Sequence, residues 1–161
     1  MSKAFGIGFA AMVVVLAIVI WMAFSKTAGN HLAPTGAIGK IRTQKIADDL
    51  TFMVIDFNVT NDSDRDMIVR NIFPSFVQAD GSSTMGSMVA ANDTVNAFRS
   101  YPTLGEQYNP PLKERDVIPA HKTIDRMVGV RFDVPFDQVE ARHGVALDLQ
   151  DVTGVDVEMK K

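Results

Sequence analysis

Residues 123–134, which have the sequence Thr-Ile-Asp-Arg-Met-Val-Gly-Val-Arg-Phe-Asp-Val, give the clearest indication of the fold. Apolar and polar side chains alternate along this stretch, as they do in a β-strand that buries one face. The expected inner face carries Ile124, Val128, Val130, Phe132 and Val134. The expected outer face carries Asp125, Met127, Arg131 and Asp133. Arg126 is the exception on the inner side, and Pro135 is expected to end the strand because proline has no N–H for the ladder.

Shorter segments with similar alternation lie on both sides of this stretch. They are residues 38–46, 50–59, 67–79, 145–152 and 155–159. In residues 50–59, Phe52 and Val54 are also apolar on the face opposite the main apolar row. Pro74 predicts an edge strand or a bulged strand for residues 67–79. No helix of the length that connects parallel strands separates these segments, so we predict a mainly β chain that forms an antiparallel β-sandwich.

The amino-terminal segment has a different character. Residues 4–24 contain no charged residue and are bracketed by Lys3 and Lys26. A helix of this length would reach roughly 30 Å, the thickness of the hydrocarbon core of a bilayer. Trp21 and Phe24 lie near its end, where aromatic rings favour the membrane interface. We therefore predict that residues 1–26 form a single transmembrane anchor; the alternative is a cleaved signal peptide, whose apolar region is normally shorter.

The remaining chain divides into a tether and one domain. Residues 27–37 contain glycine and proline without apolar periodicity and are expected to be a tether, and residues 38–161 are expected to be the β-domain. Basic residues occur on both sides of the apolar segment, so charge alone does not orient it. The short basic leader and the type of domain favour a single-pass signal anchor in the inner (cytoplasmic) membrane. The carboxy-terminal domain would then lie on the periplasmic or extracellular side.

The composition excludes several classes of protein. The chain of 161 residues has 16 basic residues, 19 acidic residues and no cysteine. Residues 1–26 include two of the basic residues and none of the acidic ones, so the rest of the chain has 14 basic against 19 acidic residues, a net charge of −5. A nucleic-acid-binding protein with a basic face is therefore excluded. The lack of cysteine excludes a disulfide scaffold, thiolate chemistry and a lipid-modified cysteine.

Five short motifs carry a resemblance to a known family. They are Val-Thr-Asn-Asp-Ser-Asp (59–64), Phe-Val-Gln-Ala-Asp-Gly (76–81), Ile-Pro-Ala-His-Lys (118–122), Val-Arg-Phe-Asp-Val-Pro (130–135) and Val-Ala-Leu-Asp-Leu (145–149). Their order resembles the small immunoglobulin-like sandwich domains of exported bacterial lipoproteins and membrane-anchored proteins of unknown function. The resemblance covers residues 38–159 and implies an immunoglobulin-like antiparallel β-sandwich without catalytic residues. The chain departs from it at Pro119-Ala120-His121, where the family usually has Pro-Gly-Glu.

Residues 82–122 are expected to form an unusually long loop. Asn92 or Asp93 could cap a short helix that runs through Phe98, but several prolines prevent long regular structure. Long ordered loops often carry function, and aromatic residues with arginine are enriched at protein interfaces. The predicted partner-binding residues are Phe98, Arg99, Tyr101, Leu104, Tyr108, Leu112 and Arg115. The alternative is that these aromatic residues fold back over an open edge or the end of the sandwich.

The polar residues show no pattern that is typical of catalysis or of metal binding. The only histidines, His31, His121 and His143, lack the spacing of a zinc site, which needs three or four converging ligands. Residues 62–66 alternate carboxylates as a calcium loop does, but Met67 and Phe73 occupy the positions of its glycine and glutamate. A weak calcium site at this turn remains an alternative. We predict no catalytic residue, no cofactor and no metal ligand.

These observations lead to a functional hypothesis. We expect a non-enzymatic, membrane-anchored extracytoplasmic domain that acts as an accessory or assembly subunit of a larger membrane protein complex. Its expected partners are the lipid bilayer and other subunits of that complex, with no nucleic acid. The alternative is a cell-envelope binding module for a small ligand, a metal or a polymer.

Overall fold

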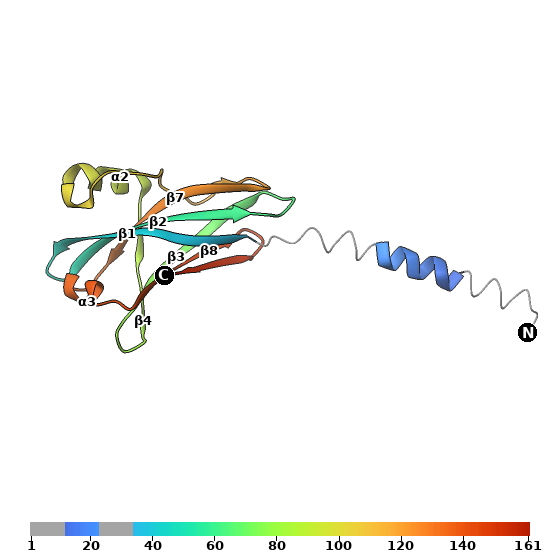
Figure 1. Cartoon of the computed structure of the whole chain (residues 1–161), viewed down its shortest axis with the longest axis horizontal. Coiled ribbons are helices and arrows are strands. Elements are labelled where there is room, and N and C mark those ends of the chain that lie inside the picture. The colour runs from blue at the N-terminus through green and yellow to red at the C-terminus, as the bar shows by residue number, and fades with distance from the viewer. Residues whose placement is uncertain (1–11, 23–33) are drawn as a thin grey trace, which may run out of the picture. The chain divides into compact units, whose positions relative to one another are not determined.

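The computed structural model describes residues 12–22 and 34–161, and these belong to two compact units that we describe separately. In the first unit, residues 12–22 form a helix with exposed side chains, and Trp21 is 71% exposed (Figure 1). The rest of the predicted anchor, including Phe24, lies outside the described residues, as do residues 27–33 of the predicted tether. Within the described parts of the chain, no helix combines the length and the hydrophobicity needed to cross a membrane.

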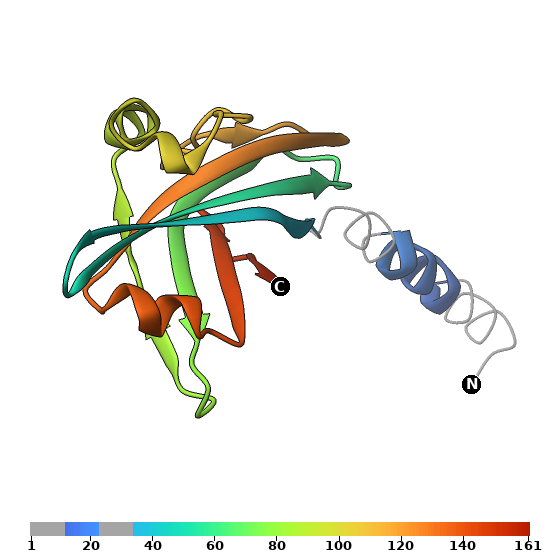
Figure 2. The same ribbon diagram turned by 60° about the vertical axis from the view of Figure 1, so that its left-hand side comes forward.

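The second unit consists of two antiparallel sheets packed face to face (Figure 1, Figure 2). Sheet I has the order β1 (Thr35–Ala47), β2 (Leu50–Asn61), β7 (Lys122–Phe132) and β5 (Ser87–Val89). Sheet II has the order β4 (Ser83–Met85), β3 (Met67–Val77), β8 (Gly144–Asp151) and β9 (Asp156–Lys160), and β6 (Val117–Ile118) pairs with the start of β3. The prediction of a mainly antiparallel β-fold is confirmed. Residues 35–37, which we expected in the tether, belong to β1.

The segment that we expected to be a long loop contains regular structure. Besides β4, β5 and β6, it includes α2 (Ala91–Ser100) and the short 3-10 helix η1 (Pro102–Leu104). The helix that we predicted here is present, but its N-cap residue is Ala90, which makes no side-chain capping hydrogen bond. Asn92 and Asp93 therefore lie inside the helix instead of capping it. A third helix, α3 (Phe136–Glu140), follows Pro135 after the end of β7.

The alternation in β7 builds the main core between the sheets, as predicted. Val128, Val130 and Phe132 are at most 1% exposed, and the Phe132 ring meets the Phe76 ring edge-on at 5.0 Å. These side chains pack with inward-facing apolar residues of β2, β3, β8 and β9. Burial of this apolar row is the main force that holds the two sheets together.

A second apolar cluster lies on the outer face of sheet I, and it corrects one expectation. Met127 was expected to face solvent, but it is completely buried beneath α2 and η1. Phe52 and Val54 of β2 lie beside it, and Leu104 of η1 covers them. Figure 1 shows α2 on the side of sheet I that faces away from sheet II. We call α2 and η1 together the helical layer.

Two glycines permit close packing around sheet I. A Cβ atom on Gly129 of β7 would lie 2.2 Å from Oγ1 of the buried Thr94 in α2, so only glycine lets the helix approach this closely. Gly86 stands between β4 and β5, where the chain passes from sheet II to sheet I. A Cβ atom there would lie 2.3 Å from Cγ1 of Val130.

β3 has a continuous partner on one side only. It pairs with β8 along residues 69–77, with a register shift between Val69 and Asn71. On its other side, β6 pairs with residues 67–68 and β4 with residues 75–77. The carbonyl of Pro74 accepts a hydrogen bond from the N–H of Gly86, so the ring nitrogen faces this second side, away from the continuous ladder with β8. The segment does contain a register shift, but it lies between Val69 and Asn71 and not at Pro74, which pairs in register with Leu147, and β3 is an interior strand of sheet II.

Candidate functional site

A buried ion pair lies on the outer face of sheet I. Nη2 of Arg42 in β1 donates to Oδ2 of Asp56 in β2 at 2.5 Å, and the two residues are only 8% and 5% exposed. Charged groups are rarely buried unless they are paired and hydrogen-bonded, because burial removes their hydration. Burial of the pair costs hydration free energy, and the pairing holds both side chains in a fixed geometry.

Arg42 and Asp56 also hold the chain that follows the helical layer. Nη1 of Arg42 donates to the carbonyl oxygens of Leu104, at 3.1 Å, and Glu106, at 2.6 Å. The second carboxylate oxygen of Asp56 accepts a hydrogen bond from Nδ2 of Asn109 at 2.9 Å. Three points of residues 104–109 are thus bonded to one ion pair. This arrangement orders a segment that has no strand or helix between residues 105 and 109.

Aromatic rings enclose the arginine. The guanidinium carbon of Arg42 lies 4.7 Å from the centre of the Phe98 ring and 5.4 Å from that of Tyr108, within range of a cation–π interaction. Nζ of Lys40 lies 5.0 Å from the Tyr108 ring centre. Tyr108 remains 59% exposed. It borders a cavity of about 220 Å³ that Asp125 also lines. The result is an exposed aromatic side chain on a firmly held backbone.

The seven predicted partner-binding residues do not form one surface. Leu104 and Leu112 are 1% and 3% exposed, so they offer no surface to a partner, and this part of the prediction is wrong. Phe98 and Tyr101 are half-buried because they pack against the apolar cluster around Phe52 and help to shield it from water. These residues fold back, as in the alternative interpretation, but over a sheet face instead of an edge.

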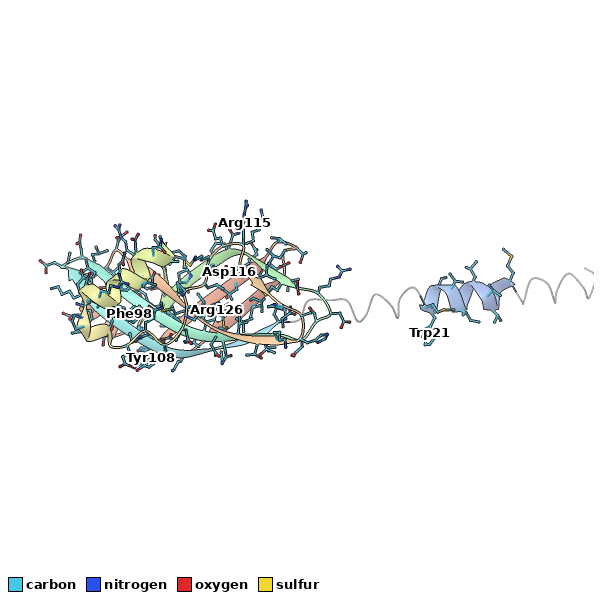
Figure 3. All side chains as sticks on the ribbon, turned by 90° about the horizontal axis from the view of Figure 1, so that it is seen from above. Trp21, Phe98, Tyr108, Arg115, Asp116 and Arg126 are labelled. Carbon is cyan, nitrogen blue, oxygen red and sulfur yellow. The ribbon has the colours of Figure 1, made fainter. Side chains whose placement is uncertain are left out.

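Only three of the seven side chains are well exposed, and they lie apart. They are Arg99 in the last turn of α2, Tyr108, and Arg115 beyond the helical layer. Figure 3 shows Tyr108 and Arg115 at opposite edges of the domain. Tyr108 and Arg115 therefore belong to two different surfaces.

Arg42, Asp56 and Asn109 were not among the predicted site residues. One signal was present, because Asp56 continues the second apolar row of β2 after Phe52 and Val54. Arg42 pairs with Val54 in the neighbouring strand and is thus diagonal to Asp56, and charged residues are rarely buried unless they are paired.

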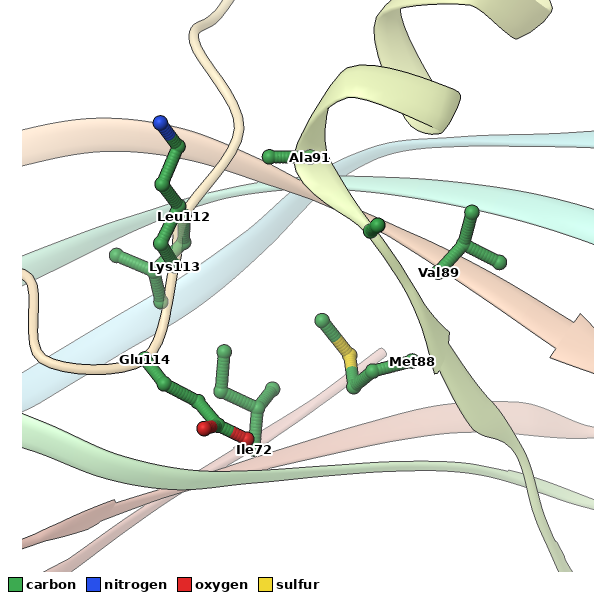
Figure 4. Close-up of a pocket in the computed structure, with 8 residues that line it drawn as sticks. Ile72, Met88, Val89, Ala91, Leu112, Lys113 and Glu114 are labelled. Atoms are coloured by element: carbon green, nitrogen blue, oxygen red, sulfur yellow. The ribbon is translucent and has the colours of Figure 1, made fainter.

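A cavity opens at the side of the sandwich where β3 lacks a continuous partner (Figure 4). Its volume is about 450 Å³, and it lies between β3, β5, the start of α2 and residues 112–114. Apolar side chains of Ile72, Met88 and Leu112 line it, and Lys113 and Glu114 add charged groups. We call it the lateral cavity.

The other predicted polar sites are accounted for by local contacts. Nε2 of the exposed His121 lies 2.9 Å from Oδ1 of Asp64, and the N–H of Ala120 donates to Asp66. The side chain of Asn61 bonds within the same turn, to Ser63 and to the carbonyl of Arg65. In residues 12–22 and 34–161, no three His, Asp or Glu side chains are grouped so that they could hold a metal ion. His143 is exposed, and His31 lies outside the described residues.

The fold and these contacts define a β-sandwich domain with a helical layer fixed to one outer face. The sequence matches no protein-family model and no curated protein.

Solved structures with a similar strand arrangement include three that differ widely in source. A candidate lipoprotein (ycdA) from Bacillus subtilis has 14% identity and a TM-score of 0.47, and the match covers 82% of this chain and 38% of that chain. The archaellum periplasmic stator protein FlaG from Sulfolobus acidocaldarius has 8% identity and a TM-score of 0.36, with 80% and 100% covered. An uncharacterized β-sandwich protein from Clostridium difficile has 13% identity and a TM-score of 0.35, with 81% of each chain covered. The chain thus spans well under half the length of the first of these proteins, and these similarities assign it to no family.

Proposed function

We propose that this protein is a non-enzymatic accessory or assembly subunit of a larger membrane protein complex. Residues 1–26 would anchor it as a single-pass helix in the inner (cytoplasmic) membrane. The β-sandwich would lie on the periplasmic or extracellular side and would bind another subunit of the complex.

The observation that carries this proposal is the exposed Tyr108 on a backbone that a buried ion pair holds in place. Interfaces favour tyrosine because it brings a large contact area with few rotatable bonds. A segment that is ordered before binding loses less conformational entropy when a partner binds. Arg42 and Asp56 supply that order, while Lys40 and the neighbouring cavity leave polar groups at the rim.

The non-enzymatic part of the proposal rests on the sequence, which contains neither a Gly-x-Ser-x-Gly motif nor a phosphate-binding loop.

The test is co-purification of the full-length chain from the membranes of its own cells in a mild detergent, followed by native electrophoresis and mass spectrometry. We expect a reproducible partner, and we expect Tyr108→Ala to lose it while the domain stays folded. Phe73→Ala is the matched control, because Phe73 is also an exposed aromatic residue, at 41%, but lies on the outer face of sheet II. A monomer without a partner, or equal loss in both variants, would contradict the proposal.

A second candidate function is a cell-envelope binding module for a small ligand, and the lateral cavity supports it. Its volume of about 450 Å³ falls within the range of small-molecule sites, and apolar side chains form much of its lining. A thermal-shift screen of envelope metabolites would test it. Met88→Trp should fill the cavity and abolish any shift that depends on it.

A further inference from the structure

We propose that Arg70 and Arg115 form a binding site for a phosphate group in a cleft at the edge of sheet II. The cleft has a volume of about 420 Å³ and is lined by Val69, Arg70, Glu114, Arg115 and Val152. It adjoins the lateral cavity, since Glu114 lines both. The site does not depend on the accessory-subunit proposal, because it lies apart from Tyr108 (Figure 3).

The backbone of β3 places the first arginine at a distortion in the ladder. Val69 pairs with Asp151 and Asn71 pairs with Gln150, so Arg70 is the extra residue at the register shift. A bulge of this kind redirects a side chain, and bulges are frequent beside functional sites. The side chain of Arg70 is exposed at the wall of the cleft.

The second arginine occupies a backbone conformation that disfavours it. Arg115 has a φ of 68°, in the left-handed region where residues other than glycine, asparagine and aspartate are uncommon. The turn is held because the N–H of Arg115 donates to the carbonyl of Val69 at 2.7 Å, and that of Lys113 donates to Oδ2 of Asp116 at 2.9 Å. Glycine would satisfy the same turn without strain. The turn alone therefore does not account for the presence of an arginine at position 115.

Neither guanidinium group is used in contacts with the described residues. Across the described part of the chain, the side chains of Arg70 and Arg115 have no hydrogen-bond or ion-pair partner. Of the other arginines, Arg42, Arg131 and Arg142 each pair with a carboxylate, Arg126 donates to the carbonyl of Asp125, and the side chains of Arg65 and Arg99 have no partner among the described residues. His121, the other residue with a positive φ that is not glycine, pairs with Asp64. Arg115 thus combines an unfavourable backbone with an unpaired charge.

The charge of the cleft opposes that of the domain. Beyond residue 26 the chain carries a net charge of −5, yet the lining of the cleft has two arginines against one carboxylate, and the same turn adds one charge of each sign, Lys113 and Asp116. A guanidinium group binds carboxylates and phosphates with paired N–H donors. One guanidinium satisfies the two oxygens of a carboxylate, whereas two favour the larger oxygen set of a phosphate. Val152, which is 47% exposed, leaves an apolar side chain at the cleft for the substituent of a phosphate ester.

The phosphate could be free in solution or belong to a lipid head group, and the experiment distinguishes these sources. The full-length chain in a non-ionic detergent would be titrated with inorganic phosphate and, separately, with dihexanoyl phosphatidylglycerol, by calorimetry at constant ionic strength. Saturable binding of at least one probe is expected. Tighter binding of inorganic phosphate would assign a free phosphate, and tighter binding of the short-chain lipid would assign a head group.

Two variants and a matched control test the assignment. Arg70→Gln and Arg115→Gly should each weaken binding by about tenfold or more, since each removes a charge-assisted pair of hydrogen bonds. Arg115→Gly should also keep or raise Tm, because glycine relieves the left-handed backbone. Arg131→Gln removes one positive charge on the outer face of sheet I and should bind normally. Absence of saturable binding, equal weakening in Arg131→Gln, or a lower Tm for Arg115→Gly would overturn the proposal.

Discussion

The two outer faces of the sandwich differ in what covers them. On sheet I, Phe52, Val54 and Met127 form an apolar face, and the helical layer buries it. On sheet II, the outward residues of β8 are Ala146, Asp148 and Gln150, and the apolar side chains of Phe73 in β3 and Met85 in β4 stay 41% and 59% exposed. An apolar second face thus requires an additional layer, whereas a polar one can face water directly.

The two faces also differ in the burial and hydrogen bonding of a carboxylate. Asp56 on sheet I is almost fully buried, and both of its oxygens accept hydrogen bonds, from Arg42 and Asn109. Asp148 on sheet II is partly buried, and within the described residues its Oδ1 has no hydrogen-bond partner. On sheet I both oxygens of the covered carboxylate are paired, although Nε of Arg42 is buried without a hydrogen-bond partner among the described residues. On sheet II the unpaired oxygen is itself buried, while the Asp148 side chain as a whole is only partly covered.

The largest effect is expected from breaking the ion pair under the helical layer. Arg42→Met would leave the Asp56 carboxylate buried without its cation and would release residues 104–109, so the free energy of unfolding should fall by about 3–5 kcal/mol. Chemical denaturation measures this loss. The double variant Arg42→Met with Asp56→Leu should recover much of it, because an apolar pair does not carry the desolvation cost of a lone charge. An unchanged stability for Arg42→Met would show that the pair does not hold the layer.

A pair of phenylalanines compares the two faces directly. Phe52→Ala on sheet I, where the side chain is 6% exposed, should lower the free energy of unfolding by about 3 kcal/mol, since it leaves a cavity beneath α2. Phe73→Ala on sheet II should lower it by less than about 1 kcal/mol, because this side chain already contacts water. Both losses in the free energy of unfolding are measured by urea denaturation at the same pH. Equal losses would mean that the outer face of sheet II is covered in solution.

The sequence predicted the strands better than it predicted the layer. Alternation in residues 123–134 is a local property, so the strand and its inner face could be recognised without knowing its neighbours. Phe52 and Val54 indicated a second apolar face, but not that residues 91–104 would cover it. That outcome depends on contacts between segments about 40 residues apart, which periodicity does not encode.

The candidate sites were less predictable still. In the sequence, Arg42 and Asp56 resemble ordinary outward-facing charged residues. They become a buried pair because β1 pairs with β2 and because residues 104–109 pack over them. Arg70 and Arg115 lie 45 positions apart in the sequence, and nothing in the residue type of Arg115 indicates a positive φ. Turn prediction relies on glycine and asparagine at such positions and therefore overlooks an arginine there.

The smallest effect concerns Asp148 and depends on pH. Burial raises the pKa of Asp148 above its ordinary value of 3.8, and the nearby Glu158 raises it further. The folded protein then binds the proton more tightly than the unfolded chain does, so stability falls as the pH rises through the folded pKa. At pH 7, Asp148→Asn should therefore be more stable than the wild type, by less than about 1 kcal/mol because water screens a partly exposed group.

Well below pH 3.8 the carboxyl of Asp148 is protonated in both states, so the difference between Asp148→Asn and the wild type should disappear. Urea midpoints at the two pH values test this, and a wild type more stable than Asp148→Asn at pH 7 would contradict it. Glu158→Gln separates the two causes, since it removes the neighbouring charge and leaves the burial. If burial is the larger cause, Asp148→Asn should still raise the stability at pH 7 in the Glu158→Gln background. That result would show that the outer face of sheet II excludes part of the water around Asp148.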